Sequence, residues 1–418
     1  MQQYCTIITI GDELLIGQVI DTNSAWMAQQ LNGIGMHVKE RISVGDVWHD
    51  IWVALDDAAR QSKLVLITGG LGPTADDITK PLLCTYFGGN MVVNEEALSN
   101  VKAIMARLKR PLIERNLKQA EVPDVCTVIQ NKRGTAPGMW FEKEGVIFVS
   151  MPGVPFEMKG MMTDYVLPQV AQRLQLPTIA HRTLLTAGVG ESFLAEMIEP
   201  WESKLPPHLK LAYLPNYGMV RLRLSGWGNN AQALQAEVNG QFEKLKELVA
   251  QHLITDEDKP LELALMQRLQ QIGHTFCTAE SCTGGYIASQ VTKHPGASNT
   301  FWGSIVSYDN SIKINVLGVS NDSINQEGAV SQTVVEQMVQ GALKTCNTHY
   351  AIAVSGIMGP NGGSPQKPVG TVWIAVGNAQ RAVSRSFHFR FDRQRNIELT
   401  TANALLMLWQ FLDSEEAS

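Results

Sequence analysis

The 418-residue sequence is poor in cysteine, and its few cysteines form no recognisable pattern. They stand far apart, with no C-x-x-C pair and no metal-ligand spacing to histidines: Cys5, Cys84, Cys126, Cys277, Cys282 and Cys346. A disulfide framework and a zinc module both require regular cysteine spacing. The sequence therefore argues against both and suits a reducing cytosol.

Long apolar runs and an excess of positive charge are also missing. No segment approaches the roughly 20 apolar residues that span a bilayer, and the apolar run at residues 6–10 follows no basic segment of the kind that begins a signal peptide. We therefore expect a cytoplasmic protein with no membrane partner. The formal net charge of −6 is the opposite of the basic footprint that binds nucleic acid without sequence specificity, so nucleic acid is not an expected partner.

The sequence does contain enough apolar residues for several cores. Hydrophobic residues make up 44% of the chain and charged residues 18%, which is typical of globular proteins. At ~100–200 residues per domain, the length predicts more than one domain. Strand-like runs at residues 6–10 and 64–68 alternate with helical patterns at 24–31 and 53–61. Such alternation is typical of βαβ units around a parallel sheet.

Two changes of pattern divide the chain into three predicted domains, over residues 1–174, 178–254 and 260–413. The middle piece combines helical patterns with a pair of strand-like runs, and the turn-rich stretch at 255–260 ends it. The predicted fold class is α/β: two three-layer α/β domains with mainly parallel sheets, joined by a small α+β module. The acidic tail after residue 412 is expected to fray.

A serine of the last domain, Ser281, lies between a predicted strand and a predicted helix. We expect the backbone N–H groups that follow it to crowd the N-terminus of that helix, where an oxyanion is stabilised. A serine at this place is more often an ordinary N-cap, so both interpretations stay open on this segment alone. The adjacent Cys282 is a weaker candidate nucleophile, because no histidine lies nearby in the sequence and buried structural cysteines are common.

Three further clusters favour the nucleophile. Lys313 ends a polar run that begins at Tyr308, and a desolvated lysine can take the proton of a serine hydroxyl. The glycine- and proline-rich loop at residues 355–371 has a length that is usually functional, although a plain surface loop is the alternative. Arg393 precedes the last predicted helix, and its guanidinium suits a phosphate unless it is simply an exposed arginine.

These segments, with residues 303–318 and 328–331, resemble the nicotinamide mononucleotide deamidase domain of the CinA family, competence/damage-inducible protein A. The resemblance implies hydrolysis of nicotinamide mononucleotide to nicotinic acid mononucleotide and ammonia, in pyridine nucleotide recycling and without a metal. Ser281 would be the nucleophile, Lys313 the base and Tyr308 an assisting group. The residues implied in substrate binding are Thr283, Gly284, Gly285, Ser355, Gly356, Gly359 and Arg393.

Glycine-rich loops and carboxylates also follow the predicted strands of the first domain. The carboxyl ends of parallel strands line the crevice where open α/β sheets bind ligands, so glycine N–H groups and carboxylates there suit a phosphate and a hard cation. For Asp76 and Asp77, capping of a helix end is the alternative. The candidates in chain order are Asp12, Glu13, Gly69, Gly70, Gly72, Asp76 and Asp77.

The first domain resembles the molybdopterin-binding fold of molybdenum-cofactor biosynthesis proteins, in the version that begins CinA proteins. The resemblance implies a metal-dependent ADP-ribose pyrophosphatase, in which Asp76, Asp77 and Glu13 share a divalent cation (Mg, Mn or Co) and the other candidates bind ADP-ribose. The alternative is a non-catalytic module that binds a nucleotide or a pterin.

The family's middle module is described as KH-like, and KH domains clamp nucleic acid with a G-x-x-G loop. The glycine pairs that begin at Gly188 and Gly226 do not fit that pattern. We therefore expect a spacer or a dimer element, and the resemblance implies a homodimer.

Overall fold

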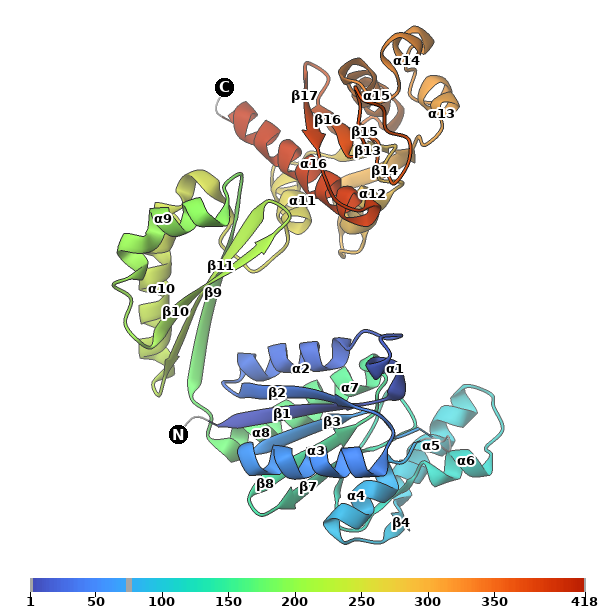
Figure 1. Ribbon diagram of the computed structural model, residues 1–418, viewed down its shortest axis with the longest axis vertical. Coiled ribbons are helices and arrows are strands. Elements are labelled where there is room, and N and C mark those ends of the chain that lie inside the picture. The colour runs from blue at the N-terminus through green and yellow to red at the C-terminus, as the bar shows by residue number, and fades with distance from the viewer. Residues whose placement is uncertain (1–2, 73–76, 417–418) are drawn as a thin grey trace. The chain divides into compact units, whose positions relative to one another are not determined.

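The computed structural model describes residues 3–72 and 77–416 (Figure 1). The described residues form two compact units: the first runs to Ile179 and includes Trp227–Leu234, and the second comprises Ala180–Gly226 and the chain from Gln235 onward. The sequence predicts separate middle and last domains, but the second unit contains the last domain and most of the middle one. The reason is a shared core, in which Leu185 and Met219 pack with Leu261. The three-domain division itself stays a prediction.

The first unit is built on a sheet with the strand order β2-β1-β3-β8-β7-β6. The first four strands of that order are parallel neighbours, and β7 and β6 continue antiparallel. The central strands β3 and β8 are buried along their whole length, as in sheets covered on both faces. The strands are β1 Tyr4–Ile10, β2 His37–Val44, β3 Leu64–Thr68, β6 Thr127–Ile129, β7 Gly138–Lys143 and β8 Val146–Met151.

Helices cover both faces of this sheet and complete three layers (Figure 1). One face carries α2 (Thr22–Gly33), α7 (Pro155–Met161) and α8 (Leu167–Leu174), with the π-helical turn Met162–Val166 between the last two; the other carries α3 (Trp48–Gln61) and α4 (Thr79–Phe87). The remaining elements are α1 Asp12–Leu15, α5 Glu95–Arg107, α6 Glu114–Lys118 and the strand pair β4 Met91–Val93 and β5 Glu121–Pro123.

The middle module is a sheet in the order β10-β11-β9-β12, with two helices on one face (Figure 1). Its strands are β9 Thr178–Ala187, β10 Leu209–Asn216, β11 Met219–Gly228 and β12 Leu253–Thr255. Its helices are α9 Glu191–Glu202 and α10 Ala231–Leu248, followed by the 3-10 turn Ala250–His252. This α+β architecture agrees with the prediction.

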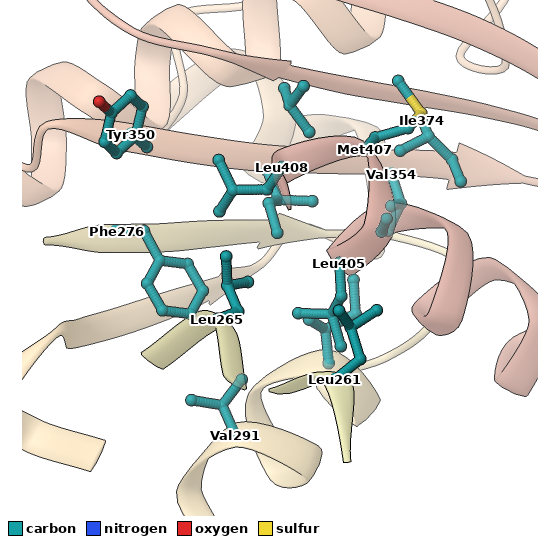
Figure 2. Close-up of a cluster of buried hydrophobic side chains, with 14 of the residues drawn as sticks. Leu261, Leu265, Phe276, Val291, Tyr350, Val354, Ile374, Leu405, Met407 and Leu408 are labelled. Carbon is teal, nitrogen blue, oxygen red and sulfur yellow. The ribbon is translucent and has the colours of Figure 1, made fainter. Parts of the chain in front are cut away.

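The last domain has a sheet in the order β14-β13-β15-β16-β17 between two layers of helices. The helices α11 (Leu261–Gln271), α12 (Tyr286–Thr292) and α16 (Arg393–Glu416) pack on one face, and Figure 2 shows Leu265 and Leu408 near Phe276 of the sheet there. The other elements are β13 Phe276–Glu280, β14 Phe301–Val306, β15 Tyr350–Gly356, β16 Thr371–Gly377, β17 Ala382–His388, α13 Asn310–Asn315, α14 Asn321–Glu327, α15 Gln332–Cys346 and the 3-10 turn Ala297–Asn299.

The predicted α/β fold class is confirmed, and one prediction about the last domain needs correction. In its sheet β13 lies parallel to β14 and β15, and β16 and β17 join through antiparallel pairing. The predicted frayed tail is helical to Glu416, since Asp413 and Glu416 both pair with Arg268. Among the described residues, no helix combines the length and apolar character that a membrane crossing demands.

Candidate active sites

The turn that carries Ser281 connects β13 to α12, and its first three residues, Ser281 to Thr283, are buried. Ser281 directly follows β13, but the N-cap of α12 is Gly285, at a left-handed φ of 96°. The prediction that Ser281 caps this helix is therefore wrong. The helix begins too late in the chain, and another side chain occupies its N-terminus.

That side chain is Glu280, which the sequence analysis did not single out. Its carboxylate is fully buried and accepts the N–H groups of Gly285, Ile287 and Ala288 at 2.9–3.0 Å. It also accepts hydroxyl hydrogen bonds from Thr278, Thr283 and Ser304. A carboxylate at a helix N-terminus is favoured by the orphan N–H groups and the helix dipole. An oxyanion at Ser281 cannot use these donors, because Glu280 already takes them.

Two other backbone donors remain next to Ser281. The N–H groups of Cys282 and Thr283 donate to no other residue in the parts of the chain that the structure describes, and the Cys282 N–H lies against its own thiol. Both residues are buried. Their position just after the candidate nucleophile suits an oxyanion of an acyl-transfer reaction. Of the predicted glycine donors, Gly284 N–H instead bonds to the Ser281 carbonyl and Gly285 N–H to Glu280.

Lys313 is a buried amine on α13. Only 1% of the residue is exposed, and its Nζ donates to the carbonyl oxygens of Ser307 at 2.7 Å and Tyr308 at 3.2 Å. Burial lowers the pKa of Lys313, while the neighbouring Cys282 and Asp309 raise it. No hydrogen bond joins Lys313 to Ser281 within the described residues, so their predicted pairing stays a prediction.

Cys282 shows that the predicted clusters converge on one place. Burial and, to a smaller extent, the charge of Glu280 raise the pKa of its thiol to about 12, although its own backbone N–H and the charges of Lys313 and Arg393 act to lower it. A Cβ atom built on Gly356 would lie 3.2 Å from Cys282 Sγ. The cysteine is thus protonated and buried at the centre of the cluster, which argues against it as the nucleophile.

The outer side of this cluster is formed by Arg393, Tyr308 and the glycine loop, which is the glycine- and proline-rich loop at residues 355–371. Arg393 donates from Nη1 to the Gly359 carbonyl at 2.8 Å and from Nη2 to the Tyr308 hydroxyl at 3.1 Å. Tyr308 is 61% exposed, so it lies at the mouth of the site and not in its interior. A guanidinium has five donors, which leaves Arg393 with N–H groups for a ligand.

Hydrogen bonds hold the glycine loop to the end of α14 and to the connection between α14 and α15. Ser355 Oγ donates to the Ala329 carbonyl at 2.7 Å, and Lys367 Nζ donates to the carbonyls of Glu327 and Val330. Ser355 thereby anchors the loop, and its predicted contact with substrate stays a prediction. Lys367 was not predicted as part of the site.

The first unit has its own cavity of about 450 Å³, a volume typical of small-molecule sites. The predicted residues that line it are Glu13, Gly69, Gly70, Gly72 and Asp77. Asp77 Oδ1 accepts the Gly72 N–H at 2.7 Å, and a Cβ on Gly72 would fall 2.5 Å from Asp77 Oδ2, so a larger residue there would displace the Asp77 carboxylate. Asp12 is not a lining residue; its carboxylate instead accepts the Asp46 N–H at 3.2 Å.

The predicted cation site is not complete in this cavity. Asp76 lies outside the described residues. Among those that are described, no group of three or more His, Cys, Asp or Glu side chains is arranged to hold a metal ion. Glu13 and Asp77 face the same cavity but do not form a ligand set by themselves.

Three comparisons with known proteins extend these observations. The CinA C-terminal domain family matches residues 258–412, the probable molybdopterin binding domain family matches 6–172, and the damage-inducible protein CinA KH domain family matches 181–255. A CinA-like protein of Flavobacterium psychrophilum is 45% identical over 407 residues, with 97% of each chain covered. The chain belongs to the CinA family.

A second curated relative supports the same membership. A CinA-like protein of Cytophaga hutchinsonii is 42% identical over 405 residues, again with 97% of each chain covered. The crystal structure of competence/damage inducible protein CihA from Agrobacterium tumefaciens is 35% identical and covers 36% of this chain and 92% of its own, with a TM-score of 0.35.

Several residues of this CinA chain that line or border the first cavity were missed from the sequence. Asp46 and Glu157 line the cavity, and burial raises the pKa of Glu157 although Asn131 donates to it at 2.6 Å. Burial lowers the pKa of Lys80 to about 8, against the opposing charges of Glu121 and Asp77. Glu157 follows Pro155, a residue type common at the start of a helix, so its place in the first turn of α7 could have been inferred. The burial of Lys80 could not be inferred from helix periodicity.

Proposed function

We propose that the C-terminal domain is an amidohydrolase that converts nicotinamide mononucleotide to nicotinic acid mononucleotide and ammonia. The observation that carries the proposal is the hydrogen bonding of Lys313. A neutral amine has two N–H donors, and the carbonyls of Ser307 and Tyr308 accept two hydrogen bonds from Nζ. That arrangement leaves a lone pair free to act as a base, and burial favours the neutral form.

The reaction begins when Ser281 Oγ attacks the carboxamide carbon and its proton passes to Lys313 Nζ. The N–H groups of Cys282 and Thr283 stabilise the tetrahedral oxyanion. Its collapse breaks the carbon–nitrogen bond, and the leaving amine takes the proton from Lys313 to depart as ammonia. Water then attacks the Ser281 ester, gives its proton through Lys313 to Ser281 Oγ, and releases the carboxylate product. Tyr308 and Arg393 hold the nucleotide portion at the mouth.

The test is product analysis with the purified full-length chain and nicotinamide mononucleotide. We expect one ammonia and one nicotinic acid mononucleotide for each substrate consumed. Release of free nicotinamide, which would mean cleavage of the glycosidic bond, or no reaction at all would contradict the proposal.

We further propose that the N-terminal domain is an ADP-ribose pyrophosphatase that uses a divalent cation. The cavity lined by glycine loops, Glu13 and Asp77 favours a phosphate-containing ligand. The described residues do not form a complete set of cation ligands, so no step is derived through the metal. The alternative is a nucleotide- or pterin-binding module without catalysis. Both proposals describe a cytoplasmic homodimer that recycles pyridine nucleotides.

A further inference from the structure

The first turn of α16 connects the candidate amidase site to another part of the second unit. Arg393 on this turn reaches the site through Tyr308 and the Gly359 carbonyl. Asn396 is fully buried and donates to the Met358 carbonyl at 3.1 Å, which ties the same turn to the glycine loop. Arg395 and Glu398 engage neither Tyr308 nor the glycine loop.

Both of these residues contact Tyr217 in the β10–β11 hairpin of the middle module. The Arg395 guanidinium lies 4.2 Å from the centre of the Tyr217 ring, and the Tyr217 hydroxyl donates to Glu398. Tyr217 and Gly218 form the hairpin turn with φ values of 50° and 78°, which fixes the direction of the tyrosine side chain. One residue at the tip of the hairpin therefore makes two polar contacts with one helical turn.

Only part of the hairpin packs against the domain behind this contact: Met219 joins the core around Leu261, and a cavity lies beside it. A cavity of about 270 Å³ is lined by Leu214 and Met219 of the hairpin, Tyr286 of α12, and Ala402 and Leu405 of α16. Continuous side-chain packing therefore does not connect the hairpin to α16 along its whole length. The contacts of Tyr217 are the polar link between the hairpin and the first turn of the helix.

We propose that Tyr217 is a positioning residue for Arg393, and that the middle module serves to hold the substrate-binding end of α16 in place. Arg393, Arg395 and Glu398 share the first two turns of one helix, so a shift of this segment moves the Arg393 guanidinium relative to Gly359 and Tyr308. The inference rests on the proposed amidase function. It assigns an effect on substrate binding, and not on the chemical step, to a residue of a different module.

The experiment compares Tyr217→Ala and Tyr217→Phe with the unaltered full-length chain. For Tyr217→Ala we expect KM for nicotinamide mononucleotide to rise about three- to tenfold, because only part of the free energy of the lost cation–π contact and hydrogen bond is transmitted to the Arg393 guanidinium. We expect kcat to stay within about twofold, because the lost interaction affects binding in the ground and transition states alike. Tyr217→Phe keeps the ring beneath Arg395, so its KM should lie between those of the unaltered chain and Tyr217→Ala. The matched control is Tyr213→Phe, which removes a hydroxyl of the same hairpin that donates to Glu202 and should leave KM unchanged.

Amide hydrogen exchange of residues 391–398 supplies a readout that needs no substrate. We expect faster exchange in Tyr217→Ala than in Tyr213→Phe, because local opening of the turn costs less without its anchor. Unchanged exchange overturns the inference even if the chain does not hydrolyse nicotinamide mononucleotide. Faster exchange with an unchanged KM, in a chain where Arg393→Ala does raise KM, overturns the link to substrate binding and leaves the proposed amidase standing.

Discussion

Lys313 is the residue whose ionisation should control the amidase. Burial lowers its pKa below the ordinary value of 10.5, and the base must be neutral, so kcat/KM should rise as pH increases through the lowered pKa. Over the same window the unfolded chain binds more protons than the folded one, so stability should also rise with pH.

Lys313→Arg fixes a positive charge at this position, and we expect it to reduce kcat by roughly 10²–10⁴-fold. Initial rates measured between neutral and alkaline pH test the expected rise of kcat/KM with pH and the expected loss of kcat in Lys313→Arg. Lys293→Arg is the control, because that amine pairs with Glu262 at 2.9 Å and takes no part in the reaction. An arginine variant that retains full activity would rule out Lys313 as the base.

Glu280 should stabilise the Ser281 turn through its charge. In Glu280→Gln the amide nitrogen faces N–H and hydroxyl donors, so some of them lose their acceptor. We expect a loss of about 2–4 kcal/mol in the free energy of unfolding. Urea denaturation measures it, with Glu327→Gln as the control because Glu327 is exposed and accepts only from Thr333 among the described side chains. Equal stability of the two variants would show that the buried charge is not required.

At the scale of single residues, the sequence predicted Ser281, Lys313 and Arg393 at one site, and the structure brings them close to Cys282. It did not predict Glu280, although this residue neighbours Ser281. A glutamate at the end of a strand has no local feature that predicts burial. Its environment comes from Ser304 on the adjacent strand and from the start of α12, which only the tertiary fold brings together.

Among the elements, the glycine loop depends most on a single side chain. Lys367→Met removes the ties from this loop to the carbonyls of Glu327 and Val330. We expect KM for nicotinamide mononucleotide to rise about fivefold, since the loop carries the Gly359 carbonyl that holds Arg393. Steady-state kinetics test this, and Lys344→Met on the exposed side of α15 is the control. If both variants share the wild-type KM, the loop does not need its anchor.

Elements with a clear pattern were predictable, and their ends were less so. The buried strand β3 agrees with its predicted bounds, whereas α16 includes Arg393, predicted to precede it, because Asp392 accepts the Arg395 N–H. The helix α15 was not predicted, although buried positions such as Val335, Met338 and Leu343 follow a helical period there. The helix α15 could therefore have been predicted, whereas the π-helical turn at Met162–Val166 could not.

For the whole molecule, the two proposed activities should be separable. Asp77→Asn keeps the size of a side chain that faces the first cavity but removes its charge. We expect ADP-ribose cleavage in the presence of Mg, Mn or Co to fall by at least roughly 100-fold, and nicotinamide mononucleotide hydrolysis to stay within about twofold. Asp57→Asn, at a surface pair with Arg60, is the control. Binding of a nucleotide without cleavage by the unaltered chain would favour the binding-module alternative.

The division of the chain shows what sequence patterns leave open at this scale. Turn-rich residues between the middle and last domains suggest a linker, but Leu185 packs into the core formed by Leu261 and Leu265. Packing of side chains distant in the sequence decides whether such a segment separates two bodies or joins them. The strand order of each sheet is likewise determined by packing between residues that are distant in the sequence.

The most direct test of the central claim compares Ser281→Ala with Cys282→Ala in the full-length chain. Nicotinamide mononucleotide is supplied, and ammonia release is followed under identical conditions. The account predicts that Ser281→Ala loses turnover by at least roughly 10³-fold while Cys282→Ala stays within about tenfold of the unaltered chain. Retained turnover in Ser281→Ala together with its loss in Cys282→Ala would contradict the account and identify the cysteine as the nucleophile.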